Sequence, residues 1–129
     1  MANPSSSFLD LTRDVSARLA TLRSGAPDVM KSFGNLGRAA MADGALTAKT
    51  KELMALALGV AARCDPCIGY HVQALVKLGA SRQELDETLA VAVYMGGGPS
   101  LMYAANAIAA FDEFSVTTGT SGTSATAPT

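Results

Sequence analysis

The sequence predicts an all-α protein, a compact bundle of about six helices followed by a disordered C-terminal tail. Hydrophobic residues make up 49% of the 129 residues, but aromatic residues only 5%, and tryptophan is absent, so the core must be built from Ala, Leu, Val and Met. Those residue types favour helices over strands. Apolar residues recur at helical spacing, and no alternating run lies between hairpin turns.

The first two helices are expected on either side of a Ser-Gly-Ala-Pro turn. The first runs from about Phe8 to Leu22 and the second from Pro27 to Met41, since Pro suits the first turn of a helix. Glycines at 34 and 37 weaken the second helix. The spacing of three or four residues indicates an apolar face on each helix, formed by Leu11, Val15, Leu19 and Leu22 in the first and by Val29, Met30, Phe33, Leu36 and Met41 in the second.

The third and fourth helices are expected to follow Thr47 and Asp65. Thr47 is a suitable N-cap for a helix that ends close to Arg63. Asp65 can cap the next helix and Pro66 suits its first turn, and this helix runs to Leu78. Because the connection between them is short, these two helices should pack antiparallel.

The last two helices have equally clear boundaries. Ser81 and Glu84 form a capping box that opens the fifth helix, which reaches Met95. The sixth helix runs from about Pro99 to Phe114. Their abundant aliphatic residues favour an oligomer, because a single small domain leaves part of such a surface uncovered.

One uncharged stretch, residues 89–110, is long enough to span a bilayer of about 30 Å. Gly96-Gly97-Gly98-Pro99 lies in its middle and Asn106 adds a polar group, so two short buried helices are expected instead of a membrane span. The N-terminus lacks the basic patch and apolar run of a secretory signal. The sequence therefore predicts a cytoplasmic protein without a membrane segment.

Residues 1–115 are expected to form one helical domain and residues 116–129 a disordered tail. The tail consists mainly of Thr, Ser, Gly and Ala, which cannot bury enough apolar surface to offset their ordering entropy. Ten basic residues against eleven acidic ones give a formal net charge of −1. No excess of positive charge is available for phosphates or anionic lipids, which argues against nucleic-acid and membrane-surface partners.

The Cys-x-x-Cys segment formed by Cys64 and Cys67 is the strongest functional signal. This spacing lets the two sulfurs meet in a small disulfide ring, and the pair lies at the start of a predicted helix. The free N–H groups and the positive dipole end of a helix start favour a thiolate, and they can lower a cysteine pKa from about 8.5 to between about 3.5 and 7.5. Cys67, just inside the first turn, gains most, whereas Cys64 lies just outside the helix.

His71, the single histidine, and Glu52 are the expected proton-transfer groups. His71 lies four residues after Cys67 and shares its face of the helix, where the imidazole can take a proton from sulfur or return it. Glu52 lies on the preceding helix, and antiparallel packing could bring its carboxylate toward the cysteines. The alternative is that Glu52 is exposed and pairs with Lys49 or Lys51.

Together these residues resemble the signature of the alkylhydroperoxidase D-like branch of the carboxymuconolactone decarboxylase family. The shared pattern is Glu52, then Cys64-x-x-Cys67, then His71 after three further residues. The flanking segments 51–57 and 90–99 are similar to helices of the family, and the resemblance covers roughly residues 8–114. Pro66 stands where some relatives carry another histidine.

The resemblance implies an all-helical fold that assembles as a homo-oligomer, commonly a trimer or hexamer. It also implies thiol-dependent peroxidase or disulfide reductase activity of the peroxiredoxin type, without a cofactor or metal. The substrate would be a hydroperoxide or disulfide, and the reductant a dithiol or a lipoyl group. By the same analogy Cys67 attacks the peroxide, Cys64 resolves the oxidised sulfur, and Glu52 and His71 form a proton relay.

Two other functions stay open on the sequence alone. Cys64, Cys67 and His71 could supply three ligands of a zinc site, which Glu52 or water would complete. The cysteine pair could instead serve as a redox sensor in an oligomeric binding protein. A sensor would form the disulfide but turn over slowly.

Overall fold

The computed structural model describes residues 7–117, and this part of the chain is all-helical. The prediction of six helices is confirmed, with boundaries close to those expected. The helices are α1 (Phe8–Gly25), α2 (Pro27–Met41), α3 (Ala48–Ala61), α4 (Asp65–Lys77), α5 (Arg82–Gly96) and α6 (Gly98–Thr117).

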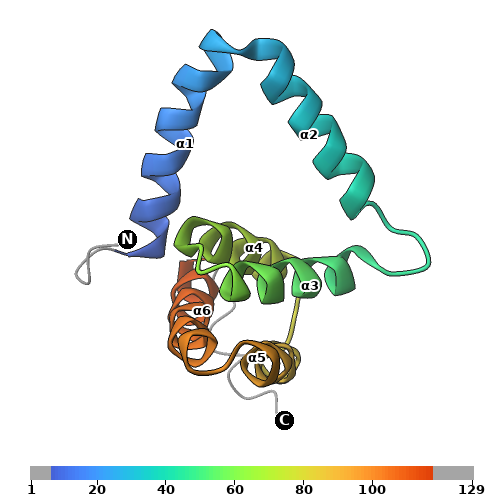
Figure 1. Ribbon diagram of the computed structural model, residues 1–129, viewed down its shortest axis with the longest axis vertical. Coiled ribbons are helices and arrows are strands. Elements are labelled where there is room, and N and C mark those ends of the chain that lie inside the picture. Colours follow the sequence, from blue (N-terminus) through green and yellow to red (C-terminus); the bar gives the residue numbers. More distant parts are fainter. Residues whose placement is uncertain (1–6, 118–129) are drawn as a thin grey trace.

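The hydrophobic core lies among the last four helices. Helix α3 packs against α4, α5 and α6, and α6 also packs against α4 and α5 (Figure 1). Leu, Val and Ala form this core as expected, but the expected methionines do not: none is among the core residues of the described chain, and Phe114 is the largest fully buried side chain. The other fully buried large side chains are Leu56, Val60, Ile68, Val72, Leu75 and Leu85.

Helices α1 and α2 form an arch that rises from this core and returns to α3 (Figure 1). The foot of α1 is fixed to the body, because the backbone N–H groups of Phe8 and Leu9 donate to the carboxylate of Glu113 at 2.9 and 3.0 Å. Thr12 is the one buried residue of α1, and α2 has none. The apolar faces of both helices exist as the sequence indicates, but the core of this chain does not cover them.

Two of the three predicted N-cap residues are confirmed. Thr47 and Ser81 cap α3 and α5 as predicted. The expected cap at Asp65 is wrong: Cys64 is the N-cap of α4, and Asp65 is its first helical residue. Between α5 and α6 the chain turns at Gly97, whose φ of 74° lies in the left-handed region that glycine tolerates best.

Helix α6 extends into the segment that was predicted to be the tail. This helix includes Val116 and Thr117, so helical structure continues two residues beyond the expected boundary at Ser115. Residues 118–129, which make up the rest of the predicted tail, lie outside the described residues. Between residues 7 and 117, no helix has the length and apolar character that crossing a membrane requires.

The capping box of α5 also ties this helix to α3. The Ser81 N–H donates to the Glu84 carboxylate at 2.9 Å, and the Glu84 N–H donates to the Ser81 hydroxyl at 3.0 Å. The ammonium of Lys49 on α3 lies 2.9 Å from the same carboxylate. The Ser81 backbone donor, and after it Lys49, lower the pKa of Glu84 below its ordinary value of 4.5.

Glu84 therefore predicts a loss of stability in acid. Because its pKa is lower in the folded chain, the contribution of this carboxylate is complete above pH 4.5 and is lost as the pH falls through the folded-state pKa. We expect Glu84→Gln, which keeps an oxygen for the capping bond, to lower the free energy of unfolding at pH 7 by a few tenths of a kcal/mol, as exposed ion pairs do. Urea unfolding at pH 7 and pH 3 measures this.

The variant should also lose less stability between these two pH values than the unsubstituted chain. Glu87→Gln, an exposed glutamate on the same helix, is the matched control and should behave like the unsubstituted chain. An equal acid-induced loss in Glu84→Gln and the unsubstituted chain would contradict the prediction.

Candidate functional site

The turn between α3 and α4 brings the cysteines to the start of a helix. The N–H of Arg63 donates to the carbonyl of Val60 at 3.1 Å, and the N–H of Cys64 donates to the carbonyl of Gly59 at 3.0 Å. These two bonds form a Schellman motif, in which the residue after the helix adopts the left-handed conformation. Arg63 occupies that position with a φ of 58°. The chain therefore reverses immediately before Cys64.

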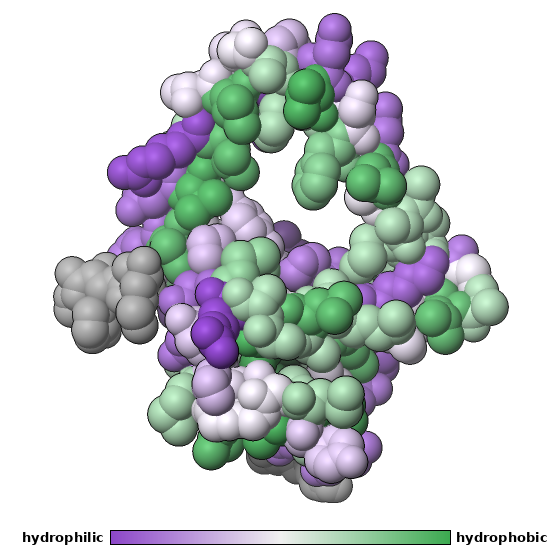
Figure 2. Space-filling view, in the orientation of Figure 1, coloured by the Kyte–Doolittle hydropathy of each residue, from purple (hydrophilic) through white to green (hydrophobic). Residues whose placement is uncertain are grey.

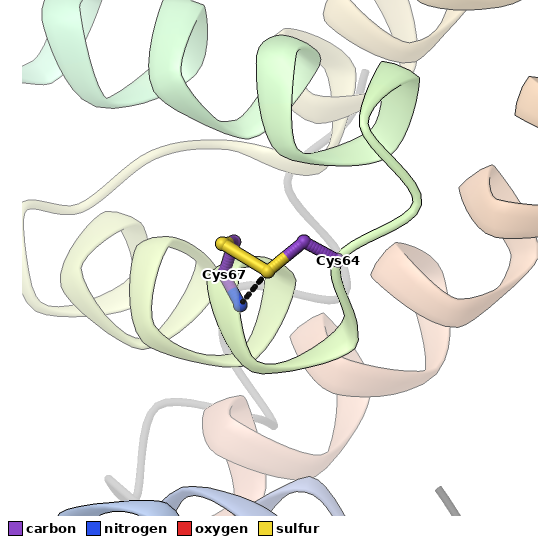
Figure 3. Close-up of a disulfide and its surroundings, with 2 residues drawn as sticks. All are labelled: Cys64 and Cys67. Carbon is purple, nitrogen blue, oxygen red and sulfur yellow. Dashed lines mark hydrogen bonds between the residues drawn. A yellow bond between two sulfur atoms is a disulfide. The ribbon is translucent and has the colours of Figure 1, made fainter. Parts of the chain in front are cut away.

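Cys64 and Cys67 form a disulfide at the mouth of α4, with their Cα atoms 5.2 Å apart (Figure 3). Both residues are half-buried. The Cys64 sulfur also accepts a hydrogen bond from the Cys67 N–H at 3.2 Å, and so acts as the N-cap of the helix. The prediction that the two sulfurs can meet is confirmed, because this pair lies at bonding distance.

The helix start supplies the electrostatic environment expected for a reactive cysteine. In the reduced state the cap position would hold the Cys64 sulfur beside the free N–H groups of the first turn, where negative charge is favoured. Cys67 lies within that first turn. Both sulfurs therefore lie at the helix start, as the sequence analysis expected for Cys67.

His71 and Glu52 contact each other across the α3–α4 interface. The Nδ1 atom of His71 lies 2.6 Å from Oε1 of Glu52, with the two side chains 33% and 16% exposed. A neutral imidazole that donates from Nδ1 to this carboxylate keeps Nε2 free as a proton acceptor. The contact therefore orients the imidazole and selects its tautomer.

Glu52 does not pair with the neighbouring lysines. Lys49 pairs with Glu84, and Lys51 donates to the backbone carbonyl of Ala42 at 2.6 Å. The alternative of an exposed Glu52 bound to either lysine is wrong. Sequence reasoning could not decide this, because the three side chains are neighbours on one helix and only the tertiary structure selects their partners.

Helices α3 and α4 approach each other closely at Gly59, on the side of α4 that carries both Cys67 and His71. A Cβ atom on Gly59 would lie 3.2 Å from Cβ of Cys67, so α3 and α4 are in direct contact there. Glu52 lies two helical turns before Gly59 on α3, and His71 one turn after Cys67 on α4. The disulfide and the Glu52–His71 pair thus lie along one line of contact, which we call the α3–α4 seam.

Asp65 and Asn106 form a buried polar contact beside the disulfide. Asp65 is only 6% exposed, and its carboxylate accepts a hydrogen bond from the Asn106 amide at 2.9 Å. The sequence analysis treated Asp65 only as a cap and Asn106 only as a polar interruption. The sequence did hold a signal for this contact. Asn106 carries an amide within an uncharged apolar helix, and a polar group in such surroundings needs a hydrogen-bond partner.

The described residues offer no ready zinc site. Within residues 7–117, no group of three or more His, Cys, Asp and Glu side chains is arranged to hold a metal ion. Both cysteine sulfurs are joined to each other in this structure. The zinc alternative thus gains no support from the geometry.

Comparison with known proteins points consistently to one family. The pattern of the carboxymuconolactone decarboxylase family matches residues 27–110. A solved structure of a protein of that family from Legionella pneumophila, in its apo form, is 58% identical and covers 84% of this chain and 96% of its own, with a TM-score of 0.83.

Two more distant relatives agree with this assignment. A Thermotoga maritima protein of the same family, for which a part in the antioxidative response has been suggested, is 32% identical, covers 84% of this chain and 95% of its own, and has a TM-score of 0.74. An uncharacterised protein from Cupriavidus necator is 39% identical over 99 residues, which is 77% of this chain and 88% of its own.

The close approach at Gly59 predicts that this position tolerates no side chain without cost. In Gly59→Ala the new methyl group would press on Cys67, which the disulfide and the helix hold in place. We expect the free energy of unfolding to fall by about 1 to 3 kcal/mol, as overpacked sites do, although alanine has the higher helix propensity.

Urea unfolding of the oxidised protein measures the effect. Gly25→Ala is the control, because no atom lies within 4 Å of the added Cβ, and its stability should be unchanged or slightly raised. A Gly59→Ala protein as stable as the control would show that the seam is looser than described.

Proposed function

This chain belongs to the carboxymuconolactone decarboxylase family, and from that premise we propose that it is a cytosolic thiol-dependent peroxidase of the alkylhydroperoxidase D-like branch. The observation that carries the proposal is the disulfide between Cys64 and Cys67 at the start of α4, on the same seam as the Glu52–His71 pair. A peroxidase of this type needs an attacking thiolate, a second thiol and a proton-transfer group, and these residues offer all three.

The first step is attack of the Cys67 thiolate on the outer oxygen of a hydroperoxide. The O–O bond breaks, Cys67 becomes a sulfenic acid and the alkoxide leaves as an alcohol after taking one proton. Cys64 then attacks the Cys67 sulfur, water leaves and the disulfide forms. A dithiol or lipoyl-type reductant restores both thiols by two thiol–disulfide exchanges, in which the reductant becomes a cyclic disulfide.

His71 would transfer the proton between the Cys67 thiol and the leaving alkoxide in these reaction steps. Its Nε2 is the free acceptor once Nδ1 donates to Glu52, and it lies one turn from Cys67 on the same helix. The imidazole takes the proton of the Cys67 thiol and returns it to the leaving alkoxide. Glu52 is a positioning residue, because it holds the ring and stabilises the imidazolium that forms in between.

A redox sensor is the second candidate, and the same disulfide favours it. A sensor would form and release the Cys64–Cys67 bond without rapid turnover. The relationship to the Thermotoga maritima protein, for which an antioxidative role has been suggested, supports either reading. The rate of peroxide consumption in the presence of excess dithiol separates the two.

The two cysteines should give different defects. Cys67→Ser should abolish peroxide consumption, because it removes the thiol that lies one helical turn from His71, whereas Cys64 lies seven residues from this imidazole. In the absence of added dithiol, Cys64→Ser should consume one equivalent of peroxide and then stop, because the sulfenic acid at Cys67 has no internal partner. Peroxide decay with several hydroperoxides and several dithiols, a lipoyl donor included, measures turnover, and mass spectrometry detects the trapped sulfenic acid.

Comparing Cys64→Ser with Cys67→Ser separates an effect on the reaction from an effect on folding. Both variants remove one thiol and replace it with a hydroxyl of similar size, so a general effect on folding would reduce both activities alike. Retained turnover in Cys67→Ser would show that Cys67 does not attack the peroxide.

Glu52→Gln should slow the reaction without preventing disulfide formation. The glutamine oxygen can still accept from His71, but the negative charge that stabilises the imidazolium is gone. We expect kcat/KM to fall by about 10- to 100-fold, less than the full contribution of a general base, and the acidic limb of the pH–rate profile, where the basic imidazole becomes protonated, to shift. Glu87→Gln serves as the control, and an unchanged pH profile in Glu52→Gln would exclude the positioning role.

A further inference from the structure

Asp65 carries a buried carboxylate that the proposed reaction does not use. It is 6% exposed, and of the acidic and basic side chains between residues 7 and 116 it alone is buried. Its carboxylate accepts a hydrogen bond from the Asn106 amide at 2.9 Å. Burial removes the solvation of a carboxylate, and one neutral amide restores only part of it. A neutral side chain would fill this position at a lower cost in free energy, so the charge itself is the feature to explain.

The carboxylate shares the start of α4 with the two sulfurs. Asp65 is the first residue of this helix, directly after the N-cap Cys64 and two residues before Cys67. A carboxylate in a first turn usually interacts with the free N–H groups of its own helix. In this chain the Cys67 N–H donates to the Cys64 sulfur, and Pro66 has no N–H. The Asp65 carboxylate is bound to Asn106 on α6 instead, and it remains beside the first turn.

Asp65 acts on the sulfurs through its electric field and not through contact. Its carboxylate faces α6, whereas Cys67 lies against Gly59 of α3, on nearly the opposite side of the helix. An α-helix with its side chains is about 10 Å in diameter. Across about that distance in protein, two unit charges interact by roughly a factor of ten in an equilibrium constant. A negative charge at Asp65 therefore opposes a negative charge on either sulfur.

The other charged groups around the cysteines are paired or exposed. From α3, Glu52 contacts His71 of α4, and from the connecting turn Arg63 is exposed, where water weakens its field. From α6, Glu113 accepts from backbone N–H groups at the start of α1, and the charged side chains of α1 are exposed. Among the described residues no cation pairs with Asp65. Its charge is thus not neutralised by a neighbour.

We propose that Asp65, held by Asn106, favours the Cys64–Cys67 disulfide over the dithiol and so sets the redox equilibrium of the site. The disulfide is neutral, whereas the reduced pair loses a proton to form the thiolate that reacts. A fixed negative charge raises the free energy of that thiolate and leaves the disulfide nearly unaffected. Asp65 touches no substrate and is a positioning residue.

This inference deepens the proposed function, on which its consequence for the reductant rests. A disulfide favoured in this way has a more negative reduction potential and is harder to reduce. Its reduction takes two electrons and two protons, which a dithiol supplies while it closes a cyclic disulfide of its own. The charge of Asp65 therefore favours a dithiol over a monothiol as the reductant.

Asp65→Asn tests the charge, because the asparagine oxygen can still accept from Asn106. The oxidised and reduced forms are equilibrated with oxidised and reduced dithiothreitol at pH 8, and alkylation followed by mass spectrometry counts them. We expect the equilibrium constant for disulfide formation to fall about tenfold, which makes the potential about 30 mV less negative. A loss of stability common to both redox forms cancels in this comparison.

Asp28→Asn is the matched control. Figure 2 shows hydrophilic side chains gathered on the outer side of α1 and α2, where water screens charges. Asp28 is exposed in the first turn of α2, so removing its charge should leave the redox equilibrium unchanged. Asp65→Ser covers the case in which Asp65→Asn does not fold, and it should shift the equilibrium in the same direction. An unchanged equilibrium in a folded Asp65 variant, a shift toward the disulfide, or an equal shift in Asp28→Asn would overturn the proposal.

The rate of alkylation separates a charge effect from a loosened structure. With Cys64→Ser, Cys67 is the single thiol of the chain, and the thiolate is the form that reacts. Adding Asp65→Asn should raise the rate several-fold at pH 7, and adding Asp28→Asn should not. The difference should vanish at high pH, where the thiol is fully ionised in every variant. A difference that persists at high pH would show that Asp65 only aligns α6, and would reject the charge effect.

Neither measurement requires peroxide. Turnover lost in the unsubstituted chain, with the redox shift of Asp65→Asn still present, would reject the proposed function alone. Turnover present without that shift would reject this inference alone.

Discussion

The reversal of the chain at Arg63 is the constraint on which the rest of the site depends. A residue with a Cβ in the left-handed region costs about 1 to 2 kcal/mol, and two backbone hydrogen bonds that end α3 hold it there. The reversal turns α4 back along α3, so that Gly59 meets Cys67 and Glu52 meets His71. With a longer connection, the disulfide and the Glu52–His71 pair could lie on different sides of the molecule.

Local signals in the sequence predicted most of the fold. Thr47 and the Ser81–Glu84 box define helix starts through hydrogen bonds within four residues, and such short-range contacts can be recognised without knowing the tertiary structure. The cap at Cys64 was missed, and Asp65 was predicted in its place, because a cysteine sulfur is an unusual acceptor and Asp a common one. Arg63 was not singled out either, since helices that end in this way usually carry glycine at that position.

The residues of the candidate site could be proposed from the sequence, but their contacts could not. The spacing of Cys64, Cys67 and His71 follows from one helix, and so their proximity could be argued from helical geometry. Glu52 required the packing of a second helix, and both of its neighbouring lysines were reasonable partners until the structure showed theirs. On α1 and α2 the periodicity of apolar residues was read correctly, but periodicity shows only which face is apolar, and not that this face stays exposed in the single chain.

The Asp65–Asn106 hydrogen bond has a consequence for how the core is specified. Helix α6 meets the rest of the core partly through Ala104, Ala107 and Ala110, whose small, similar side chains distinguish poorly between alternative alignments of one helix along another. Sliding or rotating α6 would leave the buried Asp65 carboxylate without the amide that donates to it. The loss of that hydrogen bond costs far more free energy than a displaced methyl group. The Asn106 amide therefore acts together with the buried Phe111 and Phe114 to fix a single register of α6 beside the Cys64–Cys67 disulfide.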